Sequence, residues 1–212
     1  KEIKRISANG SEIWTRGADS SYKLIVDSNN DIIQMKSGTT NGLTKNVTKY
    51  DENGSIIWQK NSNPNTSHTG NHDPQGAIYE LNDGGYVIAC AKGVIEKIDT
   101  NGDFVWEYMY DASMSGDISF SSIIQDSGGD IIALGFMRSP DVTGFILKID
   151  SQGNHIQYIQ MQDNSGADNS TGEIYPFSIS EISDGGFIMG ATSSYNRISG
   201  SRDRHISTMI KL

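Results

Sequence analysis

Short apolar runs separated by turn residues recur along the whole chain. In "KIDTNGDFVW" (97–106), one such run leads into an Asn-Gly pair and a second run that ends at Trp106. Asn-Gly or Gly-Gly between extended runs is a strong hairpin signal, because the favoured tight turns need positive φ angles. Apolar residues do not follow the helical spacing i, i+3, i+4, i+7 over any stretch longer than about ten residues. The pattern therefore predicts an all-β protein.

The same phrase returns at near-regular intervals. Its other copies are "RISANGSEIW" (5–14), "KYDENGSIIW" (49–58) and "KIDSQGNHIQ" (148–157). The four turn glycines, Gly10, Gly54, Gly102 and Gly153, are spaced by 44, 48 and 51 residues.

A second phrase, a turn followed by an apolar run, interleaves with the first. It reads "DSNNDIIQ" (27–34), "NDGGYVIA" (82–89), "DSGGDIIA" (126–133) and "SDGGFIMG" (183–190). Asn29 and Asn30 replace the glycine pair in the first copy, and Asn tolerates positive φ better than other non-glycine residues.

Together the two phrases define a unit of four short strands. In the third copy the strands are expected at 120–126, 130–137, 144–150 and 155–161. Repeats of about 40–50 residues built from four strands are typical of β-propeller blades. The sequence thus predicts one β-propeller domain over 1–212, with about four four-stranded blades and a repeat of about 44–57 residues.

The expected blades are approximately 18–60, 76–110, 118–161 and 175–212, the last completed by 3–16. An N-terminal strand that completes the last blade would close the ring and remove its open sheet edges. Two alternatives stay open: the four blades are a segment of a larger ring, or they pair with a second chain.

These units resemble a broad family of bacterial and archaeal propeller repeats, which read approximately "DGGYIIAG…LIKxDxxGxxxW". The copies that carry the resemblance are "DGGFIMGATSS" (184–194), "TGFILKIDSQG" (143–153) and "KYDENGSIIW". The units are also similar to Kelch-like blades and to the Trp-docking blades of quinone-dependent dehydrogenases, where Gly precedes Trp by four. The resemblance covers essentially the whole chain and implies a propeller, commonly in secreted or surface proteins. It does not imply a bound quinone, because the docking of blades is a structural role.

Trp14, Trp58 and Trp106 keep the Gly-to-Trp spacing of four, whereas the fourth copy has Gln157 at this place. We expect each Trp to fill the space between adjacent blades, because an aromatic side chain buries a large apolar area. A basic residue also recurs in the third strand and alternates with apolar neighbours, which predicts a solvated strand face. This residue is Arg5, Lys49, Lys97, Lys148 or Lys211, according to the copy.

The composition limits the classes of binding partner that the chain is expected to have. The net charge of −9 and the pI near 4.8 disfavour nucleic acid, whose phosphates attract Lys and Arg, and equally an anionic membrane surface. No apolar run approaches the roughly 20 residues that span a bilayer, so no membrane insertion is expected. The single Cys90 lies in an apolar run, which indicates a core thiol and no internal disulfide.

No metal or other cofactor is expected, with calcium as the alternative. The turns "DENGS", "DTNGD" and "DSQGN" suggest calcium, yet they lack the alternating acidic ligands and the distal Glu of a calcium loop. Asp51, Asp99 and Asp150 are better explained as turn formers whose carboxylates accept nearby main-chain N–H groups.

Functional residues are expected in the connections that differ between copies, because loops on a rigid scaffold carry binding and catalytic groups. The long connections 61–76, 162–175 and 192–205 belong to one face of a propeller. The ligand-binding candidates they supply are His68, His72, Asp73, Asp163, Asp168, Glu173, Tyr195, Arg197, Arg202, Asp203, Arg204 and His205.

Three hypotheses follow. The first is an extracellular or cell-surface binding module without catalytic residues, whose ligand is a carbohydrate or a protein. The second is a propeller-type hydrolase or lyase with carboxylates and His at the channel mouth. The third is an architectural blade array of a larger surface protein. A propeller supports many functions, so the fold does not choose among them; the ligand and the oligomeric state stay open.

Overall fold

Short strands and tight turns make up the described part of the chain. The computed structural model describes residues 2–17, 21–37, 45–61, 76–89, 93–110, 118–138, 142–161, 173–194 and 206–211. Their strands, β1–β17, form five antiparallel sheets, so the all-β prediction is confirmed. Within these ranges no helix is long and apolar enough to cross a membrane.

Three of the sheets have four strands each, paired in chain order. The first contains β3 (Ser21–Val26), β4 (Ile32–Ser37), β5 (Lys45–Tyr50) and β6 (Ile56–Asn61). The second contains β7 (Ala77–Glu80), β8 (Tyr86–Ala89), β9 (Val94–Ile98) and β10 (Phe104–Met109). The third contains β11 (Ile118–Gln125), β12 (Ile131–Met137), β13 (Thr143–Ile149) and β14 (His155–Gln160).

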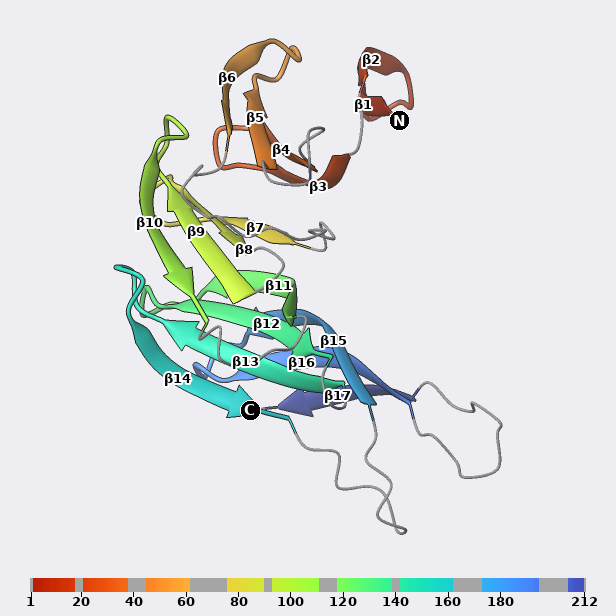
Figure 1. Ribbon diagram of the computed structural model, residues 1–212. Coiled ribbons are helices and arrows are strands. Elements are labelled where there is room, and N and C mark those ends of the chain that lie inside the picture. The colour runs from red at the N-terminus through yellow and green to blue at the C-terminus, as the bar shows by residue number, and fades with distance from the viewer. Residues whose placement is uncertain are drawn as a thin grey trace.

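A smaller sheet lies at each end of this series. The N-terminal sheet has two strands, β1 (Glu2–Ile6) and β2 (Glu12–Gly17), and the C-terminal sheet has three, β15 (Glu173–Glu181), β16 (Phe187–Ser194) and β17 (Ile206–Lys211). Figure 1 shows the sheets following one another along an arc, with β1–β2 at one end and β15–β17 at the other. The ladders of the described strands do not pair β1 or β2 with β17, so ring closure by 3–16 stays a prediction.

The core lies between successive sheets. One apolar cluster joins Ile33 and Met35 of β4 to Ile78 and Ile88 of the next sheet. Equivalent clusters lie between the second and third sheets and between the third sheet and β15–β17. The second and third four-stranded sheets therefore face an apolar cluster on each side, which explains why β8 and β12 are apolar on both faces.

The turns have the predicted chemistry. Gly10, Gly54, Gly102 and Gly153 all have positive φ, and so does Asn30, with φ of 63°. Each turn closes with paired main-chain hydrogen bonds, and Asp51, Asp99 and Asp150 each accept two main-chain N–H bonds. The turn-forming role of these aspartates is thus confirmed.

Candidate functional site

Most of the loop candidates lie outside the described residues. Glu173, the exception, is the first residue of β15 and accepts a 3.1 Å hydrogen bond from the hydroxyl of Tyr175. The other loop residues stay predictions, as does Cys90. The candidates that lie outside the described residues are His68, His72, Asp73, Asp163, Asp168, Tyr195, Arg197, Arg202, Asp203, Arg204 and His205.

The described contacts that stand out lie at the junctions between sheets. At three junctions, the indole of the last strand in one sheet reaches the turn between the last two strands of the next sheet. Its Nε1–H donates to a main-chain carbonyl in that turn. The pairs are Trp14 with Glu52 (3.0 Å), Trp58 with Thr100 (3.0 Å) and Trp106 with Ser151 (3.1 Å). These contacts support a docking role, which remains a proposal.

A glycine lies under each indole. Gly102 has φ of +78°, and a Cβ built on it would approach the Trp58 ring to 2.8 Å. Gly54 and Gly153 stand in the same relation to Trp14 and Trp106, at 3.0 and 2.9 Å. Only glycine combines the positive φ with this close approach. Two physical requirements therefore place glycine in these turns.

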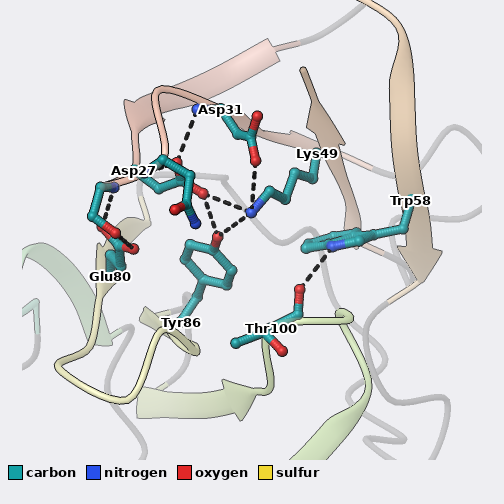
Figure 2. Close-up of polar contacts among 9 residues, drawn as sticks. Asp27, Asp31, Lys49, Trp58, Glu80, Tyr86 and Thr100 are labelled. Carbon is teal, nitrogen blue, oxygen red and sulfur yellow. Dashed lines mark hydrogen bonds and ion pairs between the residues drawn. The ribbon is translucent and has the colours of Figure 1, made fainter. Parts of the chain in front are cut away.

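Beside Trp58 lies a buried ionic cluster, drawn in Figure 2. The Lys49 ammonium contacts the carboxylates of Asp27 at 2.7 Å and Asp31 at 3.1 Å. The Tyr86 hydroxyl, from the next sheet, donates to Asp27 at 2.8 Å and accepts from Lys49 at 3.1 Å. The cluster therefore ties the first two four-stranded sheets together.

The prediction that the recurring basic residue marks a solvated strand face is wrong for Lys49. Its side chain is 8% exposed and that of Asp27 is 0% exposed. Lys148 is held in the same way by Asp126 and Asp130, both at 2.9 Å. The missed signal is the spacing "DSNND" and "DSGGD", which puts a carboxylate at both ends of the turn that faces the lysine.

The ionisation states in this cluster are fixed by its geometry. Burial alone would raise the pKa of Asp27, but hydrogen bonds from Lys49 and Tyr86 hold that pKa below its ordinary value. Burial opposes the charge on Lys49, yet the hydrogen bonds to Asp27, Tyr86 and Asp31 raise its pKa. Burial and the Asp27 carboxylate raise the pKa of Tyr86. A protonated lysine and a neutral tyrosine held this way are structural groups, and neither is prepared to act as a base.

A second polar contact crosses the junctions at the ends of β7, β11 and β15. Glu80 accepts hydrogen bonds from the main-chain N–H and the hydroxyl of Ser28, both at 2.7 Å. Glu181 does the same for Ser127, at 2.8 and 2.7 Å, while Gln125 accepts from the N–H of Asn82 at 2.8 Å. The sheets that begin with β7, β11 and β15 thus each hold a turn of the sheet before them.

The junction between β11–β14 and β15–β17 contains a cavity of about 250 Å³. The strand ladders show why. Lys49 pairs with Trp58 and Lys97 with Trp106, but Lys148 pairs with Gln157. We call this cavity the Gln157 pocket. Its lining consists of Ile132, Ile146, Lys148, Gln157, Ile159, Gly185, Gly186 and Phe187.

The described residues offer no group of three or more His, Cys, Asp or Glu side chains placed to hold a metal ion. The Gln157 pocket contains one ionisable side chain, Lys148, and two aspartates already neutralise it. The pocket is therefore an apolar site with an amide at its edge.

Comparison with known proteins agrees with this architecture. No family model matches the chain, and no curated protein matches it. Among solved structures it is similar to an α-L-arabinanase from Penicillium chrysogenum complexed with arabinobiose, with a TM-score of 0.55, 10% identity and 89% of this chain covered. It also matches BamB from Moraxella catarrhalis, with a TM-score of 0.45, 15% identity and 98% covered.

A third match is the extracellular domain of BT3049 from B. thetaiotaomicron, with a TM-score of 0.49, 15% identity and 88% of this chain covered. The chain spans 23% of the BT3049 domain, 60% of the arabinanase and 70% of BamB. The arabinanase and BamB are β-propeller proteins, and the likeness to the arabinanase shows the fold. The chain has a β-propeller-type fold.

Proposed function

We propose that this chain is a propeller-type binding module, built from the repeat that its sequence resembles, and that it serves an extracellular or cell-surface protein. The observation that carries the proposal is the Gln157 pocket. Three junctions are filled by an indole, whereas the fourth presents a cavity of about 250 Å³ with an apolar lining. Concave, mostly apolar sites with a few polar groups are the usual form of binding sites.

Binding is favoured over catalysis by the state of the ionisable groups. Lys49, Asp27 and Tyr86 are held in fixed protonation states by one another. Lys148, beside the pocket, is paired with two carboxylates. General acid–base chemistry needs a group whose pKa lies near the working pH and which can reach a substrate. In the hydrolase or lyase hypothesis the carboxylates and histidines come from the long connections.

The pocket favours a protein ligand over a carbohydrate. Isoleucine and phenylalanine side chains make up most of the side-chain lining, and the polar contributions are one amide and one neutralised ammonium. A sugar buried there would leave hydroxyl groups without partners, which costs free energy. A carbohydrate ligand fits the polar loop residues of the long connections better than it fits the pocket.

The test is to offer the purified protein a glycan array, with and without calcium, and a random peptide library displayed on phage. The proposal predicts specific, saturable hits, among the peptides first. A blank result on both would contradict a binding module and favour an architectural blade array. Turnover of a bound glycan would instead support the hydrolase or lyase hypothesis.

A further inference from the structure

We infer that the Gln157 pocket binds the indole ring of a tryptophan side chain that a partner protein presents. The inference rests on the proposed binding function and names the chemistry of the partner. Its basis is that the same place is filled by an indole at every other junction between the described sheets.

Equivalence of position comes from the strand ladders. Gln157 pairs with Lys148 as Trp58 pairs with Lys49 and Trp106 with Lys97. Side chains at equivalent register positions of a repeated sheet point to the same face. The Gln157 side chain therefore starts where an indole starts in the other sheets, and a Gln fills less of that space.

One wall of the pocket matches the wall against which Trp58 packs. Trp58 packs against a cluster that contains Ile33 and Val47, and the corresponding residues of the next-but-one sheet, Ile132 and Ile146, line the pocket. The apolar side chains against which an indole packs are thus present in the lining of the pocket.

The pocket also offers an aromatic side chain for an edge-to-face contact. Trp58 meets Tyr86, the first residue of β8, at 6.2 Å between ring centres and 62° between planes. Phe187 is the first residue of β16 and lines the pocket at the corresponding place. Edge-to-face pairs of this kind stabilise aromatic packing beyond the area they bury. Phe187 would give an entering indole the partner that Tyr86 gives Trp58.

A polar group in the lining suits an indole as well. The Gln157 amide carries an acceptor for the indole N–H, the bond that main-chain carbonyls accept at the filled junctions.

The test is an NMR titration of ¹⁵N-labelled full-length chain with N-acetyl-tryptophanamide, and with N-acetyl-leucinamide as the aliphatic comparison. We expect saturable shifts of the Ile146, Lys148, Gln157 and Phe187 amides, and at least tenfold weaker binding of the leucine amide. Gln157→Trp should abolish the shifts because its own ring fills the pocket. Ile156→Trp is the matched control, since Ile156 is 46% exposed and the next position along a strand faces the other side.

Absence of saturable shifts, or equal binding to Gln157→Trp, would overturn the inference. Contacts from the chain's own turn at 7–11 to Gln157, detected as nuclear Overhauser effects, would also overturn it. Peptides selected on the wild-type chain separate this failure from failure of the proposed function. If selected peptides bind without Trp and bind Gln157→Trp equally well, the binding module stands and the indole inference fails.

Discussion

The indole N–H of Trp58 donates to the main-chain carbonyl of Thr100 over 3.0 Å, although 42 residues separate them. The bond joins the outer strand of one sheet to a turn of the next. Trp14 and Trp106 repeat it at the neighbouring junctions. One indole thus bridges the two sheets at each of these three junctions.

Replacing Trp58 by Ala should destabilise the fold by about 3 kcal/mol, since large-to-small aromatic changes in packed sites cost roughly 3–5 kcal/mol and this indole is half-buried. Chemical denaturation measures the free energy of unfolding. Ile57→Ala serves as the control, because Ile57 is 50% exposed on the other side of the same strand. A change for Trp58→Ala no larger than that for Ile57→Ala would remove the docking role.

Two glycines separate the cost of positive φ from the cost of crowding an indole. Gly10 and Gly102 have φ of +86° and +78°, but a Cβ on Gly10 would meet no atom within 4 Å, whereas one on Gly102 would meet Trp58. Gly10→Ala should cost about 1–2 kcal/mol for the left-handed conformation alone. Gly102→Ala should cost about 1–3 kcal/mol more through overpacking. Equal losses in denaturation would show that the indole does not press on the turn.

Lys49→Met should destabilise the protein by about 3 kcal/mol or more, because it leaves Asp27 buried without its cation. Lys60→Met is the matched control. Lys60 also pairs with an aspartate, Asp103, but the two side chains are 40% and 62% exposed, so the pair should contribute about 0–1 kcal/mol. Similar losses for the two variants would contradict the buried cluster.

The cluster also predicts how stability depends on pH. The pKa of Asp27 is lowered in the folded state, so its contribution is present above its ordinary pKa of about 4 and is lost as the pH falls below that value. The pKa values of Lys49 and Tyr86 are raised, so their contributions are present at neutral pH and decline as the pH rises past about 10.

Unfolding free energies of wild type and Asp27→Asn between pH 2.5 and 7 test the acid side of this prediction. The variant lacks the titrating group, so the difference between the two proteins should shrink as the pH falls. A difference that stays constant over this range would contradict the lowered pKa of Asp27.

Much of the fold could be predicted because its signals are local. A Gly-Gly or Asn-Gly pair between apolar runs requires a hairpin turn wherever it occurs. The predicted strands of the third unit agree with β11–β14 to within two residues at each end. Asn30 took the positive φ expected from its place in the turn.

The junction chemistry could not be predicted in the same way because it depends on contacts between sheets. Lys49 alternates with apolar residues and reads as an exposed position, yet Tyr86 from another sheet covers it. The Gln157 substitution was visible in the sequence. Its meaning appeared only when the ladders placed it opposite Lys148 and beside Phe187.

The central claim is that position 157 marks an unfilled indole site, and the unfolding free energy of Gln157→Trp tests it most directly. Filling a cavity with a fitting side chain commonly adds about 0.5–2 kcal/mol, so we expect Gln157→Trp to be more stable than wild type by that amount. Trp106→Gln, which creates the same pairing at the neighbouring junction, should be less stable than wild type. A Gln157→Trp protein that is no more stable than wild type would contradict the account.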